Sequence, residues 1–123
     1  MSHTYSTIQL TDKSNIKHCV VAYYVSNIVV IKKDTWIRLW HAPIIITTTP
    51  LREVAAMLRE AGIALMKVVD KDYGDRYIQP CHIISFTEFK RGTSIRLLGE
   101  TAGFYTTMPY EQVVKEYEAF RQE

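Results

Sequence analysis

The sequence lacks the features that would place the chain in a membrane or in a common class of enzyme. Its longest apolar runs, residues 19–25 and 28–31, fall well short of the roughly 18–20 residues of a membrane-spanning helix. No basic segment followed by an apolar core opens the chain, so no signal peptide is expected. There is no G-x-S-x-G motif and no glycine-rich phosphate loop. We therefore expect a cytoplasmic protein that is not an enzyme and needs no cofactor.

Cysteine is scarce, with Cys19 and Cys81 as its two occurrences in 123 residues. A chain of this length forms a core without a disulfide, so we expect two reduced, partly buried thiols. Each cysteine adjoins a histidine, His18 or His82. Neighbouring residues on a strand point to opposite faces, which argues against a shared zinc site. The acids at 70, 72 and 75 lack the glycine and glutamate of a calcium loop. No metal site is expected.

The chain also has little excess of charge of either sign. It contains 15 Lys and Arg and 13 Asp and Glu, which gives a net charge of +2. The distribution is uneven: residues 1–62 carry +3 and residues 63–123 carry −1. Asp34 is the one acid among five basic residues between positions 16 and 52. This local excess allows a basic surface, although charges in hairpin loops are more often simply solvated.

A repeated segment gives the chain its organisation. The block T-x-I-R-L occurs at residues 35–39, and 58 positions separate Ile37 from Ile95 in the related block T-S-I-R-L. Each block leads to a threonine-rich stretch, then to Pro50 or Pro109, and then to apolar residues at helical spacing. We predict a single domain, 1–123, made of two pseudo-repeats at approximately 20–62 and 63–120.

The predicted fold is α+β and mostly β, with two small antiparallel sheets that each carry one helix. An edge strand is expected at 5–10, and strands follow at 19–24, 28–31, 35–40 and 44–48. Thr49 is expected to cap a helix that starts at Pro50 and ends near Gly62. The second sheet is expected from segments within 63–107, before a helix that starts at Pro109. The predicted core comprises Ile37, Leu39, Leu51, Val54, Leu58, Ile95, Leu97, Val113 and Tyr117.

The most unusual side-chain pattern is an alternation of aromatic and cationic residues at Trp36, Arg38 and Trp40. On one face of a strand, such a stripe suits stacking on bases or contact with a protein partner. Core packing of the two tryptophans beneath the other half of the molecule or the N-terminal strand is the more common explanation of such a pattern.

The order of the predicted elements resembles the LytTR DNA-binding domain over nearly the whole chain. The local matches are S-N-I-V-V-I at 26–31, for the family's first strand, and P-L-R-E-V-A-A-M-L at 50–58, for its helix. The resemblance implies an elongated, mostly β domain whose loops enter successive major grooves of DNA. The family's His-Arg-Ser run has no counterpart at residues 66–70. The strand–strand–helix unit is also similar to the small flagellar FlbD-like family.

Three functions remain open at this point. The first is a LytTR-like transcription regulator that binds double-stranded DNA through Lys32, Lys33, Arg38, Lys67, Lys90 and Arg91. The second is a protein-interaction module that binds a partner through an edge strand or through Trp36, Arg38 and Trp40. The third is a ligand sensor with a site between the two halves. A homodimer is compatible with each of them.

Overall fold

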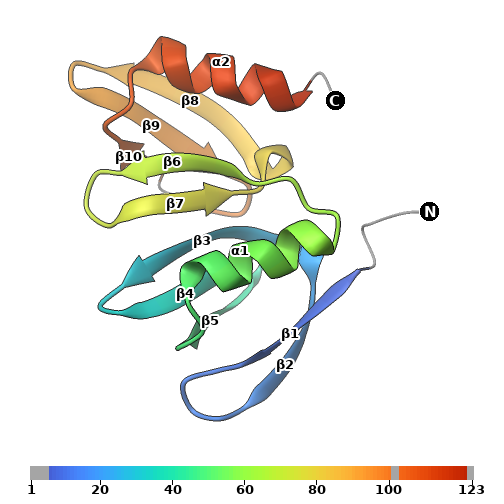
Figure 1. Cartoon of the computed structure of the whole chain (residues 1–123). Helices are drawn as coiled ribbons and strands as arrows, with labels where there is room; N and C mark the ends of the chain where they lie inside the picture. The colour runs from blue at the N-terminus through green and yellow to red at the C-terminus, as the bar shows by residue number, and fades with distance from the viewer. Residues whose placement is uncertain (1–5, 101–102, 122–123) are drawn as a thin grey trace.

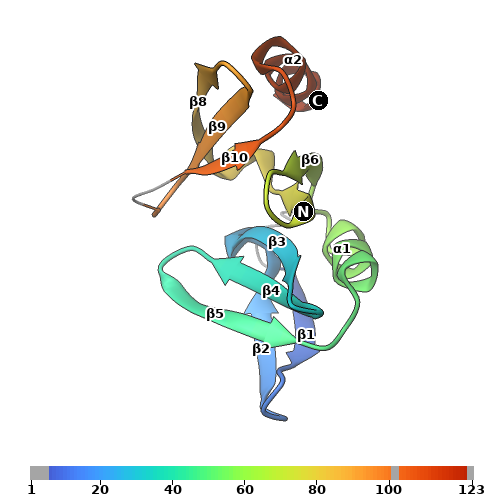
Figure 2. The same cartoon turned by 90° about the vertical axis from the view of Figure 1, so that its left-hand side faces the viewer.

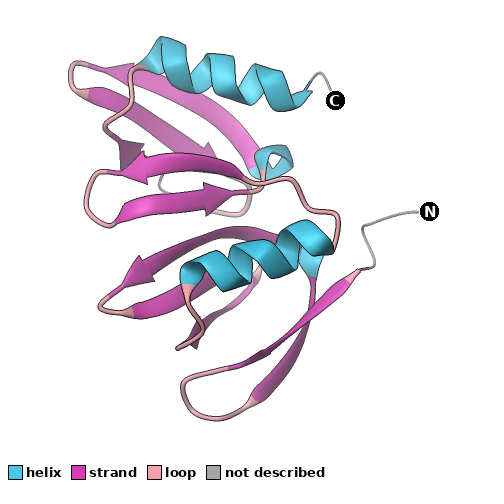
Figure 3. Cartoon of the chain, viewed as in Figure 1, coloured by secondary structure: helices cyan, strands magenta, loops and turns pink. Residues whose placement is uncertain are grey.

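The structure is a computed structural model that describes residues 6–100 and 103–121. Along these residues, five strands and a helix are followed by five more strands and a second helix. Figure 3 distinguishes helices from strands by colour. The elements of the first half are β1 Thr7–Thr11, β2 Lys17–Val21, β3 Val25–Ile31, β4 Asp34–Leu39, β5 Ala42–Thr47 and α1 Leu51–Glu60. Those of the second half are β6 Met66–Asp70, β7 Gly74–Ile78, β8 Ile83–Phe89, β9 Gly92–Leu97, β10 Phe104–Thr106 and α2 Tyr110–Arg121.

Eight of the strands form one antiparallel sheet in the order β5-β4-β3-β7-β6-β10-β9-β8, and β1 and β2 form a separate hairpin (Figure 1). The prediction of two small sheets is therefore wrong, although the mostly β character is confirmed. The two halves merge because β3 pairs with β7, with Asn27 opposite Ile78 and Val29 opposite Arg76. Alternation of apolar residues sets which face of a strand is buried, but it does not specify the neighbouring strand.

The elements occur in the same order in both halves. A hairpin, a 3₁₀ turn, three strands and a helix run from β1 to α1, which we call the first unit, and again from β6 to α2, the second unit. Equivalent hydrogen bonds recur: the Thr35 hydroxyl donates to the Thr49 carbonyl (2.7 Å) and the Thr93 hydroxyl to the Met108 carbonyl (2.9 Å). The repeat bounds 20–62 and 63–120 stay a prediction, and the recurring elements add the hairpin β1–β2 to the first unit.

Each helix covers its own apolar cluster. The cluster beneath α1 includes Val25, Ile28, Ile37, Val54 and Leu58. The cluster beneath α2 consists of Met66, Val68, Ile78, Ile95, Leu97 and Val113, with Phe86, Tyr117 and Phe120 packed against it. Of the predicted core, Leu39, Leu51 and Tyr117 are half-buried, and the other six residues are buried. Most of the predicted core residues are therefore buried, and they belong to both clusters.

The helices start where the prolines predicted, directly after Pro50 and Pro109. The prediction that Thr49 caps the first helix is wrong, because Pro50 itself occupies the cap position and no side chain caps the helix. Thr49 instead donates its backbone N–H to the Thr47 hydroxyl at 3.2 Å. The Pro50 carbonyl accepts from the Val54 N–H, and the Pro109 carbonyl from the Val113 N–H, both at 3.1 Å.

Several smaller expectations are corrected by the strand positions. Cys19 and Cys81 are free, as expected, but exposed, because Val20 is the β2 residue that enters the core and Cys81 lies in a 3₁₀ turn. The predicted edge strand at 5–10 appears as β1, and its residue 5 lies outside the described residues. Within the described ranges, no helix is both long and apolar enough to cross a membrane.

Candidate nucleic-acid interface and the junction between the units

Basic residues gather at hairpin turns along one edge of the molecule. Lys32 and Lys33 form the two-residue turn between β3 and β4, with φ angles of +50° and +78° that match the twist of the flanking strands. Lys90 and Arg91 form the equivalent turn between β8 and β9. These turns and the β6–β7 turn, which carries Lys71, lie on the left-hand side of Figure 1, the side onto which Figure 2 looks.

The side chains at this edge are available for contacts. Lys32, Lys33, Lys71, Lys90 and Arg91 are all exposed. The nearby acid Asp34 is engaged by Lys13, whose Nζ lies 2.7 Å from its Oδ2. The β3–β4 and β8–β9 turns therefore present cations that an extended polyanion can contact, whereas Lys71 shares the β6–β7 turn with the exposed Asp72.

Two of the predicted contact residues lie away from the turns. Arg38 is in the half of β4 remote from its turn, half-buried, with its Nη1 3.7 Å from Glu100 Oε1. Lys67 is the second residue of β6, exposed, with its Nζ 3.9 Å from Asp75 Oδ2. The structure thus brings Lys32, Lys33, Lys90 and Arg91 to one edge but does not bring Arg38 and Lys67 to it.

The Trp36, Arg38 and Trp40 stripe does not form one continuous open face. A register shift interrupts the pairing of β4 with β5 between Ile37 and Leu39. Trp40 lies beyond the end of β4 and stacks on Tyr24, with ring centroids 5.9 Å apart. A Cβ atom on Gly99, in the second unit, would lie 2.6 Å from Trp40 Cδ1. Trp40 therefore packs at the junction between the two units.

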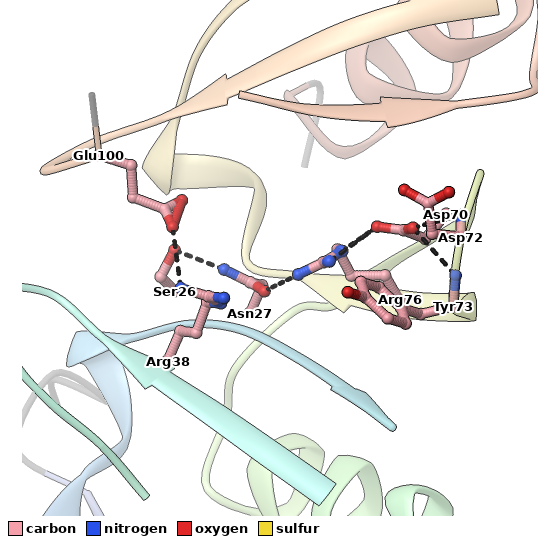
Figure 4. Close-up of polar contacts among 8 residues, drawn as sticks. All are labelled: Ser26, Asn27, Arg38, Asp70, Asp72, Tyr73, Arg76 and Glu100. Atoms are coloured by element: carbon pink, nitrogen blue, oxygen red, sulfur yellow. Dashed lines mark hydrogen bonds and ion pairs between the residues drawn. The ribbon is translucent and has the colours of Figure 1, made fainter. Parts of the chain in front are cut away.

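A buried ion pair that the sequence reasoning missed lies at the same junction (Figure 4). Arg76 on β7 places Nη2 2.7 Å and Nε 2.9 Å from Asp70 Oδ2 on β6. Its Nη1 donates to Asn27 Oδ1 on β3 at 2.6 Å, and its guanidinium carbon lies 4.4 Å from the centre of the Phe104 ring. Burial lowers the pKa of Arg76, an effect that the bonds to Asp70 oppose. This network fastens three strands of the sheet together.

The repeat offset is the signal that would have pointed to this ion pair. In the first unit, Asp12 and His18 stand 58 positions before Asp70 and Arg76. Asp12 Oδ2 lies 2.8 Å from His18 Nε2, and this hydrogen bond is the main cause that lowers the pKa of Asp12. Both aspartates also accept two backbone N–H groups of their hairpin turns.

We expect the protein to lose stability as the pH falls below about 6.5, the ordinary pKa of histidine. His82 is buried, with Nε2 2.8 Å from the Tyr23 carbonyl, and burial lowers its pKa. As the pH falls, His82 is therefore protonated in the unfolded chain before it is protonated in the folded chain. The stability that neutral His82 contributes is complete above its pKa in the unfolded chain and is lost on acidification. Urea denaturation midpoints at pH 7.5 and pH about 5 measure the loss.

His82→Gln should make the midpoint less dependent on pH over that interval. His41→Asn is the matched control, because His41 is exposed and asparagine tolerates its φ of +56°. An equal pH dependence in the His82 variant and the unchanged chain would contradict the expectation.

The remaining candidate sites are weak. Among the described residues, no group of three or more His, Cys, Asp or Glu side chains is placed to hold a metal ion. A cavity of about 270 Å³ lies at the junction and is lined in part by Arg38, His41, Leu98 and Glu100. Sites for drug-sized ligands usually occupy about 300–1,000 Å³. The structure therefore gives the ligand-sensor hypothesis little support.

The architecture described above is that of a LytTR-type domain, as the sequence resemblance predicted. The sequence matches no family model and no curated protein. Among solved structures, the chain is similar to the LytTr DNA-binding domain of a protein from Bacillus cereus, with a TM-score of 0.65. The alignment covers 94% of this chain and 98% of that chain, at 11% sequence identity. At this level of identity the similarity establishes the fold alone.

Proposed function

We propose that this protein is a non-enzymatic DNA-binding protein that regulates transcription. The observation that carries the proposal is the row of basic hairpin turns on a fold shared, over 94% of the chain, with a LytTr DNA-binding domain. In this proposal Lys32, Lys33, Lys90 and Arg91 contact phosphates of successive backbone segments. Lys71, at the turn between them, adds a contact that the sequence analysis did not include.

Base recognition requires side chains that reach into a groove. Arginine suits this task because its guanidinium can donate two hydrogen bonds to guanine. Arg91 is the arginine at the basic edge. Arg38 and Lys67 remain proposed contacts, but they lie away from the turns. Arg38 would also have to leave Glu100, 3.7 Å away, to contact a base. Specificity is therefore expected to depend on Arg91 more than on Arg38.

Replacing Lys32 and Lys33 together by glutamine should reduce the salt dependence of binding to mixed-sequence duplex DNA. Each neutralised phosphate contributes about −0.9 to the slope of log affinity against log salt concentration. Loss of two contacts should therefore make the slope shallower by about two. Fluorescence anisotropy of a labelled duplex, titrated from about 50 mM salt upward, gives this slope.

The control replaces two exposed basic residues on the helices, Arg59 and Lys115, by glutamine. It removes the same net charge away from the turns and should leave the slope close to that of the unchanged chain. Absence of any salt-sensitive duplex binding near 50 mM would rule out the DNA-binding proposal. An equal change in both double variants would rule out the role of the turns.

A second function, a protein-interaction module, is favoured by one observation. Large apolar side chains are exposed at two strands that each have one unpaired edge among the described residues. Ile84 on β8 is 56% exposed, and Ile16, next to β2, is 57% exposed. Exposed strand edges readily accept a further strand. The original candidate surface at Trp36, Arg38 and Trp40 is less suited, because Trp40 packs at the junction.

A further inference from the structure

The pairing of β3 with β7 is a joint between two similar units. Besides the ladder, the Gln79 N–H donates to the Ser26 carbonyl at 3.0 Å, and the Gln79 side chain donates to the carbonyls of Tyr23 and Val25, both at 2.8 Å. The third strand of the first unit is thus bound by the second strand of the second unit. The joint is head-to-tail, since different edges of the two units meet.

Each unit also has a strand edge equivalent to the one that the other unit contributes to this joint. At the offset of 58, β8 corresponds to β3 and β2 to β7. Among the described residues, β8 pairs with β9 alone and β2 with β1 alone. One molecule therefore carries the equivalents of both halves of its internal joint, a free β8 edge and a free β2 edge.

We propose that copies of this chain associate head-to-tail, with β8 of one copy adding to β2 of the next as β3 adds to β7 within the chain. A contact between two different edges of identical molecules is heterologous, so it produces a ring if the rotation closes and an open filament if it does not. This inference concerns self-association and does not depend on the proposed binding of DNA.

The register of the internal joint defines which residues would meet. Shifting each β3 residue forward and each β7 residue back by 58 places Phe86 of one copy opposite Cys19 of the next. Continued along both strands, the register sets Glu88 opposite Lys17, and Phe89 opposite Ile16. Glu88 and Lys17 have opposite charges and are both exposed, and Phe89 and Ile16 are 49% and 57% exposed. Opposite charges and apolar pairs are the combinations that stabilise neighbouring strands.

A groove accompanies the free β2 edge, as an incoming strand requires. It measures about 570 Å³ and is lined by β2 together with Trp40 and the start of β5, including Pro43 and the 38% exposed Ile44. The corresponding side of β7 is covered by β3 within the chain. A second copy is the occupant that fits this edge. Its β8 is equivalent to β3, the strand that covers β7 within the chain, and β2 is equivalent to β7.

Two charge reversals on exposed residues test the proposal. Lys17→Glu and Glu88→Lys each set like charges against one another when a variant associates with itself, so each should raise the concentration for association at least tenfold. Mixing the two variants restores opposite charges at both kinds of contact along an alternating series of copies. Sedimentation velocity over a range of protein concentrations, without DNA, measures the mass of the particles.

The proposal predicts assembly of the unchanged chain, loss of assembly in each variant alone, and recovery in the equimolar mixture. Ile84→Asp should also prevent assembly, whereas Val69→Asp, the same kind of apolar-to-acidic change at an exposed position of β6, should not. A monomer at all concentrations would overturn the proposal. So would assembly that persists in both charge variants, or a mixture that fails to recover, since either result places the contact elsewhere.

Discussion

Replacing Asp70 by asparagine should lower the free energy of unfolding by about 3–5 kcal/mol, the usual cost of removing one partner of a buried ion pair. The loss has a clear cause, because the side chains of Asp70 and Arg76 are 4% and 6% exposed and Arg76 would keep its charge without a counter-ion. An asparagine can still accept the backbone N–H groups of Asp72 and Tyr73, which now bond to Oδ1. The change therefore keeps the hydrogen bonds of the turn but removes the negative charge and the two contacts from Arg76 to Oδ2, and urea denaturation measures this combined effect.

The repeat supplies the matched control. Asp12→Asn removes the equivalent carboxylate, which accepts the same kind of turn hydrogen bonds but faces His18 instead of an arginine. Asp12 and His18 are half-buried, with side chains 18% and 32% exposed, so the loss should be smaller than for the buried pair. Similar losses in the two variants would show that the effect does not depend on the buried pair with Arg76.

Leu58→Ala should cost about 2–5 kcal/mol of unfolding free energy, the range for a leucine removed from a packed core. Leu58 is fully buried in the cluster beneath α1, next to Val54 and Ala55. Its removal leaves a cavity that the surrounding strands can fill only in part. The change in denaturation midpoint at constant slope gives the loss directly.

Glu60→Ala is the control, because Glu60 is exposed near the end of the same helix and alanine is a strong helix former. This variant should be nearly as stable as the unchanged chain. A Leu58 variant with an unchanged midpoint would contradict the position of α1 over the core.

Local features of the fold followed from the sequence because they depend on neighbouring residues. Pro50 and Pro109 fixed the helix starts, and the short gap between the expected strands at 28–31 and 35–40 fixed a hairpin turn. The pairing of β3 with β7 did not follow from the sequence. Asn27 and Arg76 are 49 positions apart, and the residues around each of them do not indicate which distant strand lies beside it. Two separate sheets and one joined sheet give the same alternation of apolar residues, so the pattern could not distinguish them.

The candidate site was predictable to a similar extent. Lys32, Lys33, Lys90 and Arg91 lie in turns whose positions the strands determine, so their exposure followed from the sequence. The stripe from Trp36 to Trp40 failed as a surface because strict alternation ends at the register shift after Ile37. A bulge of this kind depends on how the neighbouring strand is paired, which no local pattern records.

The central position of the hairpin β6–β7 has a consequence for how the protein unfolds. Its outer edges bond to β3 on one side and to β10 on the other, so it belongs to both halves of the sheet. A fragment that ends after α1 would leave the β3 edge without a partner, and a fragment that starts at β6 would leave the β7 edge open. Neither half can therefore melt without removing hydrogen bonds from the other, and we expect the chain to unfold as one cooperative unit although it is built from two similar parts.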